Sequence, residues 1–422
     1  MLRIAVLVSE LHGADARERL GGAFARRLAA AGLAHELVAV APAVDRAPPA
    51  PAADAAPLAL ALLTGGTEAA ALAVVARAVP AAAPVILLTH ELHNGFPAAL
   101  EVAARLRQDG RRVRVVQVPD GAPAAPLART LTALAAHQAL RQRRLALVGG
   151  PSSWLAASAP ADELVAAVWG VRVERLPIAA IAERFGAIAP ARAAAVAEDL
   201  ITASAGSAVG RGEVEQAARL ALATEDLCRA GGHDAITVRC FDLLGALGTT
   251  GCLALSRLLD AGVIAGCEGD VPTTLTMMWL AALTGATPFM ANPQAVDEAA
   301  GVVALAHCTI ARGLLESYRL DTHFESGIGV ALAGRLPRGP VTLARIGGAD
   351  LRELFVADGE LVAGGDSPDR CRTQVEVRLG GAARELLERP LGNHHVLIPG
   401  HHAALARAAH ALFIKGTLRG SL

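Results

Sequence analysis

Three short apolar runs between residues 264 and 307 each end on a polar residue, and this pattern constrains the fold more than any other part of the chain. The runs finish at Glu268, Asn292 and His307. A buried strand that ends on a carboxylate, an amide or an imidazole is typical of an open α/β sheet, where ligands bind beyond the carboxyl ends of the strands. If the strands are parallel, these side chains and Asp242, which ends the preceding run, lie along one edge.

Strand and helix patterns alternate over residues 1–140 and again over residues 141–307. This alternation predicts two sub-domains, each a parallel sheet with helices on both faces. Beyond residue 307, runs separated by Gly-rich turns predict an antiparallel β domain over residues 308–422 that ends in a helix. The Pro/Ala-rich segment 41–57 is expected to be a loop.

Composition and charge exclude several kinds of partner. The chain is 53% hydrophobic, but it has no uninterrupted apolar stretch of about twenty residues, so we expect no membrane-spanning helix. A net charge of −1 and an aromatic content of 3% argue against nucleic-acid binding. The first apolar run is followed too soon by acid and glycine to resemble a secretory signal, so we expect a cytoplasmic protein.

The lysine and cysteine content narrows the chemistry further. Lys415 is the only lysine, which argues against Schiff-base aldolases, pyridoxal-phosphate enzymes and Walker-type NTPases. The six cysteines show no CxxC spacing. We therefore expect reduced and mostly buried thiols.

A second polar cluster, Gly392-Asn393-His394-His395, could fold back onto the first. One carboxylate with two imidazoles suggests a divalent metal. Adjacent residues of an extended segment point to opposite sides, so at most one of His394 and His395 is expected to be a direct ligand. The candidate metal ligands are Glu268, His307, His394 and His395.

Each candidate residue also has a plain structural interpretation. A single histidine after a buried run, such as His307, is more often a core residue than a ligand. Arg239 and Asp242 could offer a guanidinium and a carboxylate to a polyhydroxylated substrate, or they could form a structural ion pair. The complete set favours function over structure. The candidate catalytic residues are Glu268, Asp270 and Asp242, and the candidate substrate-binding residues are Arg239, Asn292, His323 and Asn393.

Seven short motifs occur in order over about residues 145–410: GGPSSWL, TVRCFD, CEGDVPTTLTM, PFMAN, ALAHC, THFESGIG and GNHHVLIPGHH. In this set the chain resembles the L-fucose and L-arabinose isomerases, and most closely the fucose-isomerase-like proteins of unassigned substrate. The resemblance implies two Rossmann-like sub-domains followed by a barrel-like β domain. It also implies a homo-oligomer, a trimer or hexamer, with sites near subunit interfaces.

The resemblance implies an aldose–ketose isomerase that acts on a sugar and moves a proton between C1 and C2. Members of this family use a divalent ion, usually Mn²⁺, which polarises the carbonyl while acidic side chains carry the proton. By position, Glu268 matches a family ligand and acid/base, His307 matches a family histidine, and His394 or His395 matches the C-terminal histidine ligand.

The chain departs from the family pattern at one position, because Asn292 stands where the isomerases carry a second acid. An amide cannot act as an acid or a base, although Asp270 or Asp242 could replace the missing group. Two alternatives therefore stay open. One is a metal-assisted lyase or epimerase acting on a sugar acid, and the other is a catalytically silent sugar-binding protein on the same fold.

Overall fold

The computed structural model describes residues 2–30, 35–41, 58–81, 83–118, 125–414 and 416–420. Lys415 and all but the first residue of the expected loop at 41–57 lie outside the described residues. The chain divides into two compact units, Met1–Leu134 with Ala408–Phe413 and Ala135–Arg407 with Ile414–Leu422. The boundary falls within two helices, α4 (Ala125–Leu140) and α13 (Ala403–Phe413).

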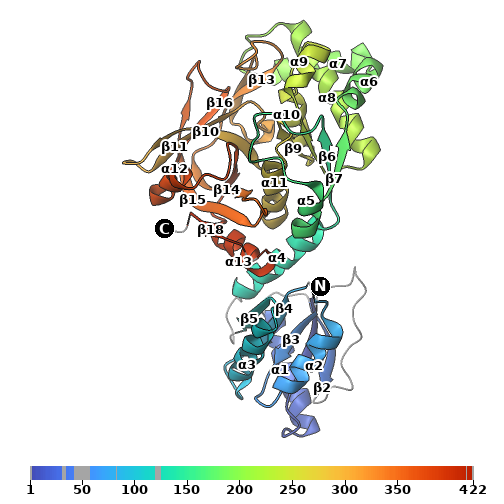
Figure 1. The fold of residues 1–422 in the computed structure, drawn as a ribbon, viewed down its shortest axis with the longest axis vertical. Helices are drawn as coiled ribbons and strands as arrows, with labels where there is room; N and C mark the ends of the chain where they lie inside the picture. Colours follow the sequence, from blue (N-terminus) through green and yellow to red (C-terminus); the bar gives the residue numbers. More distant parts are fainter. Residues whose placement is uncertain are drawn as a thin grey trace. The chain divides into compact units, whose positions relative to one another are not determined.

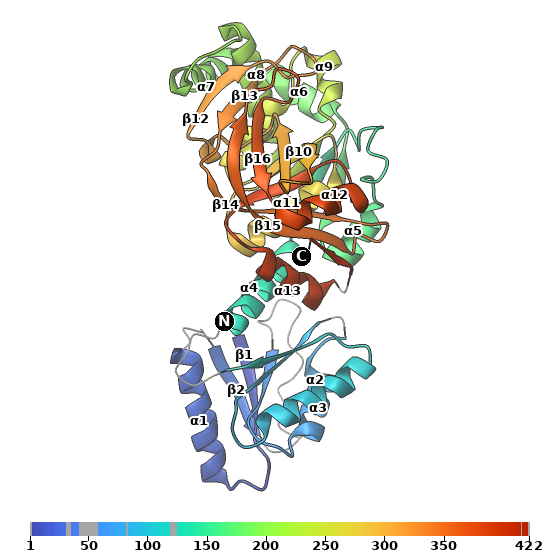
Figure 2. The ribbon, with the colours of Figure 1, turned by 90° about the vertical axis from the view of Figure 1, so that its left-hand side faces the viewer.

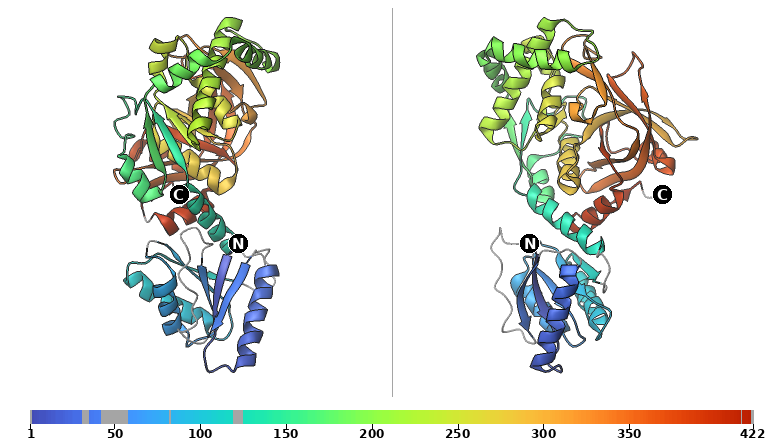
Figure 3. Two further views of the ribbon diagram at one scale, coloured as in Figure 1. Left: turned by 90° about the vertical axis from the view of Figure 1, so that its right-hand side faces the viewer. Right: turned by 180° about the vertical axis from the view of Figure 1, so that it is seen from behind.

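The first unit is built on a parallel sheet with the strand order β2-β1-β3-β4-β5. Its strands are β1 (Leu2–Leu7), β2 (His35–Ala41), β3 (Leu58–Leu62), β4 (Val85–Thr89) and β5 (Val113–Gln117). Its helices are α1 (Ala14–Ala30), α2 (Glu68–Ala78) and α3 (Gly95–Gln108). Figures 2 and 3 show α2 and α3 on one face of this sheet and α1 on the other. The apolar faces of α2 and α3 pack on the strands to form the core, as expected for buried parallel strands.

The second unit begins with a four-stranded parallel sheet of order β7-β6-β8-β9. Its strands are β6 (Arg144–Val148), β7 (Arg172–Leu176), β8 (Ala235–Val238) and β9 (Ile264–Cys267). The helices of this part are α5 (Asp162–Trp169), α6 (Ala179–Ala187), α7 (Pro190–Ala203), α8 (Arg211–Gly231), α9 (Phe241–Leu247), α10 (Cys252–Asp260) and α11 (Val271–Thr284).

A closed antiparallel barrel of six strands follows, in the order β14-β17-β10-β11-β16-β15, with β15 pairing back to β14. The barrel strands are β10 (Phe289–Asp297), β11 (Val302–His307), β14 (Gly339–Gly347), β15 (Glu353–Gly365), β16 (Thr373–Arg378) and β17 (His395–Pro399). The remaining elements are β12 (Ser317–Asp321), β13 (Ala331–Arg335), β18 (Leu418–Arg419), η2 (Arg312–Leu314), η3 (Gly380–Arg384) and α12 (Glu385–Glu388). Closure pairs the strands on both sides, so the six strands leave no open edge.

Helix α11 joins the parallel sheet to the barrel. It contacts β8 and β9 on one side and β10, β14 and β17 on the other, and Figure 1 shows it between these two parts. Most residues of α11 are buried, as expected of a helix that packs against other elements on two sides. Asp270 caps its N-terminus by accepting a hydrogen bond from the Thr273 N–H at 2.9 Å.

The predicted fold class, two parallel-sheet sub-domains and an antiparallel barrel, is confirmed. The expectation that Asn292 and His307 end parallel strands is wrong. Their strands, β10 and β11, pair antiparallel with each other and with β17 and β16 as part of the barrel. The domain limits remain a prediction. Among the described residues, no helix is long and apolar enough to cross a lipid bilayer.

Candidate functional site

Glu268 lies in the sharp turn between β9 and α11. Its φ of +63° is unusual for a residue with a side chain, and such strained backbone is concentrated at functional sites. The loop after β6 braces the turn, because Ser152 N–H donates to the Glu268 carbonyl at 2.8 Å. Trp154, from the same loop, donates its indole N–H to Glu268 Oε2 at 2.6 Å. The turn therefore fixes both the backbone and the carboxylate of Glu268.

The residue after Glu268 must be glycine. Gly269 has a φ of +72°, and a Cβ at this position would lie 2.3 Å from the Gly150 carbonyl oxygen. The two turns that the sequence shows as EGD and GGPSS therefore pack backbone against backbone, which places Glu268 beside the β6 loop.

Asp270 and His394 form a fully buried pair. His394 Nδ1 lies 2.9 Å from Asp270 Oδ2. Burial opposes the charged form of Asp270, but the Arg345 cation and the His394 hydrogen bond hold the pKa of the carboxyl well below its usual range. Asp270 is therefore an anion that accepts the Nδ1–H of His394.

The pair directs the second nitrogen of His394 toward Glu268. His394 Nε2 lies 3.7 Å from Glu268 Oε1, beyond hydrogen-bond distance, and it has no hydrogen-bond partner among the described residues. Burial lowers the pKa of His394, yet the two carboxylates raise it above its ordinary value. Burial also opposes the charged form of Glu268, but His394 and then Trp154 place the pKa of Glu268 below its ordinary value.

His307 ends β11 beside this pair. Its ring lies 5.3 Å from the His394 ring, measured between centroids, at an angle of 69°. His307 Nδ1 is within hydrogen-bond distance of Thr309 Oγ1, at 2.8 Å. Burial, followed by the neighbouring His394, lowers the pKa of His307 to about 4. His307 is therefore neutral near pH 7, the state in which an imidazole nitrogen can bind a metal or accept a proton.

His395 points away from Glu268, as the alternation of an extended segment requires. Its ring packs edge-on against Phe355, at 5.5 Å between centroids, and neither ring nitrogen has a hydrogen-bond partner among the described residues. Asn393 is exposed to solvent. Of the two adjacent histidines, the structure brings only His394 to Glu268.

Asn292 faces the end of β9 although its strand belongs to the barrel. Cys267 N–H donates to Met290 Sδ at 3.3 Å, so β10 passes the end of β9. Asn292 follows Met290 by two residues and therefore faces the same side of the strand. Its Oδ1 is buried without a hydrogen-bond partner among the described residues. An unpartnered buried oxygen is a polar atom available to a ligand.

Arg239 and Asp242 form an ion pair, with 3.2 Å between Arg239 Nε and Asp242 Oδ1. This geometry matches the structural alternative given above for the two residues. Phe241, which lies between them in the sequence, packs edge-on against Trp154 at 5.1 Å and against His323 at 5.4 Å between ring centroids. Three rings from separate segments thus form a row that begins at the Glu268 carboxylate, and His323 belongs to this row.

Two contributors were missed from the sequence. Trp154 is 52% exposed although it is bonded to Glu268, and the signal for it was a tryptophan in a loop directly after a predicted strand. Arg345 is fully buried on β14 and lies 3.4 Å from Asp270 Oδ2, measured from Nη1. Its signal was an arginine in the middle of the apolar run at 341–346.

The donors near Glu268 suit a divalent ion by their chemistry. His394 presents a free Nε2 while an anion holds its Nδ1, the arrangement that orients metal-binding histidines. Glu268 and Asn292 Oδ1 offer oxygen, and His307 offers a neutral imidazole. Within the described ranges, however, no three His, Cys, Asp or Glu side chains are already placed as metal ligands. The proposed set Glu268, His307, His394 and His395 therefore stays a prediction.

The expected thiols are present: all six cysteines are free and five are buried. Cys240 and Cys267 lie at the ends of β8 and β9 with 2.8 Å between their sulfur atoms. Because they lie beside Glu268, the surroundings of this acid on their side are buried and mostly apolar.

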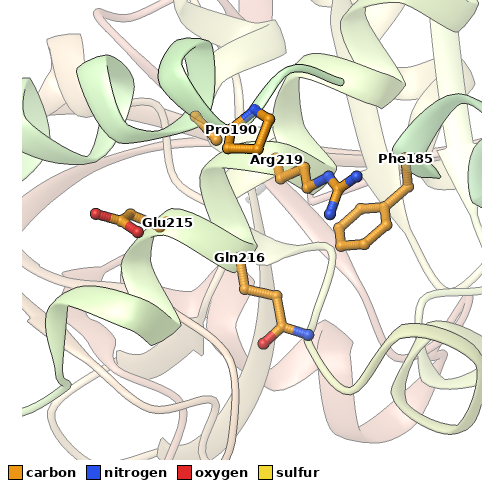
Figure 4. A pocket seen from close by; sticks show the side chains of 6 residues that line it. Phe185, Pro190, Glu215, Gln216 and Arg219 are labelled. Atoms are coloured by element: carbon orange, nitrogen blue, oxygen red, sulfur yellow. The ribbon is translucent and has the colours of Figure 1, made fainter. Parts of the chain in front are cut away.

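A hollow of about 240 Å³ opens elsewhere, among α6, α7 and α8. Figure 4 shows five of its lining residues, Phe185, Pro190, Glu215, Gln216 and Arg219. The Arg219 guanidinium covers the Phe185 ring, with its central carbon 4.7 Å from the ring centroid. No predicted site residue lines this hollow, so the arrangement of polar groups around Glu268 is what identifies the candidate site.

No family model matches the chain. Comparison with curated proteins finds similarity to sulfoquinovose isomerases. The protein of that name from Alkalicoccus urumqiensis is 27% identical over 199 residues, which cover 44% of each chain. The one from Clostridium sp. (strain MSTE9) is 35% identical over 111 residues, 26% of this chain and 24% of the relative. The one from Priestia aryabhattai is 29% identical over 119 residues, 27% of each chain.

These matches each span less than half the length of the curated relatives. The relatives carry the name of a sugar isomerase, which agrees with the resemblance seen in the sequence at the level of sugar isomerases. The finer expectations, a likeness to fucose or arabinose isomerases and a homo-oligomeric state, remain predictions.

Proposed function

We propose that this chain is a sugar isomerase that interconverts an aldose and a ketose, with Glu268 as the base that moves the proton between C1 and C2. One observation carries the proposal. A strained, partly exposed carboxylate stands 3.7 Å from an unpartnered imidazole nitrogen that a buried anion holds in place. Glu268 is thus a base and His394 an acid in the same site. Trp154 and Asp270 hold them in place and are not themselves free to react.

The proposed chemistry needs one base for a carbon-bound proton and one donor for the sugar oxygens. Glu268 has a pKa below its ordinary value and is ionised near pH 7, so its Oε atoms can accept the proton from C2 and return it to C1. Because its pKa is raised, His394 can donate from Nε2 to the carbonyl oxygen on C1 as the enediol forms, and it can take the proton of the C2 hydroxyl as the ketose forms. A single carboxylate therefore suffices when the same group removes and returns the proton.

Asp270 is not the second acid in this proposal. It accepts hydrogen bonds from Thr273 N–H and His394 Nδ1 and is paired with Arg345. Both of its oxygens are engaged and its side chain is fully buried, so a sugar in solution cannot reach it. Its role is to hold His394.

A divalent ion bound by Glu268, His394, His307 and the amide oxygen of Asn292 would supply Lewis-acid polarisation of the sugar carbonyl. With such an ion bound, His394 Nε2 would be a ligand and not a proton donor, and the ion would supply the polarisation that the protonated imidazole supplies without it. His307 and Asn292 present neutral donors, and Glu268 supplies the negative charge that favours cation binding.

The substrate class we propose follows from the relatives' name and from the aromatic row. Sulfoquinovose, a glucose that carries a sulfonate on C6, is the first substrate to test because the relatives are named for it. Trp154 is suited to contact the apolar face of a sugar ring, because its exposed indole lies beside the proposed base.

The test is conversion of sulfoquinovose, and of unmodified aldohexoses, in D₂O, followed by NMR. Isomerisation should give a ketose that keeps all the carbon and oxygen atoms of the starting sugar, with deuterium at C1 to the extent that the proton held by Glu268 exchanges with solvent. Glu268→Gln should reduce turnover at least about 100-fold. The matched control is Glu183→Gln, which changes an exposed glutamate on α6 and should leave turnover unchanged.

Three outcomes would contradict the proposal. Turnover of Glu268→Gln within tenfold of the wild type would remove Glu268 from the reaction. Cleavage of the sugar into two fragments would favour the lyase alternative. Tight sugar binding without turnover, with or without added Mn²⁺, would favour the silent binding protein.

A further inference from the structure

Arg345 is a cation in a place where cations are rarely found. It lies in the middle of the barrel strand β14, between Ala344 and Ile346, and its side chain is fully buried. A buried charge persists only when several partners compensate for its lost hydration. The partners of Arg345 therefore indicate what the residue does.

The guanidinium contacts three separate segments of the second unit. Nη1 lies 3.4 Å from Asp270 Oδ2 and donates to Thr273 Oγ1, both at the start of α11. The same nitrogen donates to the backbone carbonyl of His394. Nη2 donates to Ser158 Oγ at 2.6 Å, in the loop that follows β6. Arg345 thus ties the barrel to the helix and the loop that carry the candidate site.

The backbone before His394 is shaped around this guanidinium. Gly392 has a φ of +147°, and a Cβ there would lie 2.2 Å from Arg345 Nη2. Glycine in the GNHH motif therefore leaves the space that Arg345 occupies. Arg345 contacts the backbone carbonyl of His394 and the carboxylate of Asp270. It therefore contacts both residues that form the Asp270–His394 hydrogen bond.

We infer that Arg345 is a positioning residue for the isomerase site: it fixes Asp270 and the backbone of His394 so that His394 Nε2 faces Glu268. The inference rests on the proposed function for its kinetic consequence. The structural consequence, which is the orientation of the His394 imidazole, does not depend on that function. Lysine cannot reproduce it, because a single ammonium lacks the fork that reaches Asp270, His394 and Ser158 together.

The test compares Arg345→Lys and Arg345→Met with the wild type. We expect kcat to fall about 10- to 100-fold, the range typical of groups that orient a reacting side chain, while KM changes less than threefold. Arg345→Lys should retain more activity than Arg345→Met. Guanidinium ion at millimolar concentration should restore part of the kcat of Arg345→Met and none of the deficit of Glu268→Gln.

A second measurement is independent of activity. The ¹⁵N NMR signals of the His394 imidazole, recorded on histidine-labelled protein at a fixed pH of 8 without metal, should show an Nδ1–H donor to a carboxylate in the wild type. They should shift in both Arg345 variants. The matched control, Arg257→Met, removes a partly buried arginine that is paired with Glu225 on α8, and it should leave these signals and kcat unchanged.

The outcomes separate the two proposals. Folded Arg345 variants with unchanged kcat and unchanged His394 signals would overturn the positioning role. An inactive wild type whose His394 signals nevertheless move in the Arg345 variants would reject the isomerase proposal and support the positioning of His394. If Arg345→Met does not fold, Ser158→Ala, which removes one contact to Nη2, should produce a smaller shift of the same signals, and the absence of that shift would count against the inference.

Discussion

Replacing His395 with methionine tests whether His395 is a buried core residue or a metal ligand. The side chain is 2% exposed and packs on Phe355, with no hydrogen-bond partner for either ring nitrogen among the described residues. Burial, the main cause, lowers its pKa from 6.5 to about 3. Below pH 6.5 the unfolded chain therefore binds a proton here that the folded chain does not, so folding stability is lost as the pH falls from about 6.5 to about 3.

The size of the effect follows from the width of that window. One pKa unit corresponds to about 1.4 kcal/mol, so this histidine costs the folded state about 2 kcal/mol at pH 5 relative to pH 8. Methionine has a similar volume and no titrating group, so His395→Met should change stability by less than about 1 kcal/mol at pH 8. At pH 5 it should be more stable than the wild type by about 2 kcal/mol.

The assay is urea unfolding of wild type and variant at pH 8, 7, 6 and 5, with equal m-values as the condition for comparison. Leu397→Met is the matched control, since it changes a buried residue on the same strand, and its effect should not vary with pH. Activity should be retained. A stability difference that stays constant with pH would refute the reasoning, and a folded variant that loses about 100-fold or more in turnover would make His395 a member of the site.

Two further changes test the architecture around Glu268. Gly269→Ala should destabilise the protein by at least about 2 kcal/mol in urea unfolding. The residue has a positive φ, and a Cβ at this position would meet the Gly150 carbonyl. A loss of stability below about 0.5 kcal/mol would contradict the observed turn. Trp154→Phe keeps an aromatic ring but removes the hydrogen bond to Glu268 Oε2. The kcat measured by steady-state kinetics should therefore fall about tenfold. An unchanged kcat would show that this hydrogen bond does not serve catalysis.

The sequence predicted the parallel sheets because alternating strand and helix patterns leave few other folds. It did not predict that Asn292 and His307 lie on barrel strands, since a short apolar run looks the same in a parallel and in an antiparallel sheet. One signal was available. Only four residues separate Asp297 at the end of β10 from Val302 at the start of β11, and a parallel connection needs a dozen or more.

The choice between the adjacent histidines could be narrowed from the sequence but not made. Alternation along an extended segment allowed at most one of them to be a direct ligand. The histidine that faces the site is the one beside Asp270. Asp270 lies 124 residues away in the chain, and only tertiary packing brings the two together. Arg345 was invisible for the same reason, because its partners come from three segments that are distant from it in sequence.

The charges around the site explain how the chain can work with an amide at position 292. Glu268 and Asp270 are both anions, and the fully buried Arg345 compensates only one of them. Asp270 and Arg345 neutralise each other, and Glu268, the more accessible of the two acids, faces His394, whose pKa the two carboxylates raise. A second free acid at position 292 would add a like charge on the side of β10 that faces the end of β9, and like charges raise the pKa of a carboxyl. His394 and then Trp154 place the pKa of Glu268 below its ordinary value, and the uncharged amide adds no like charge that would oppose this ionised state, which a proton-abstracting base or a cation-binding carboxylate requires.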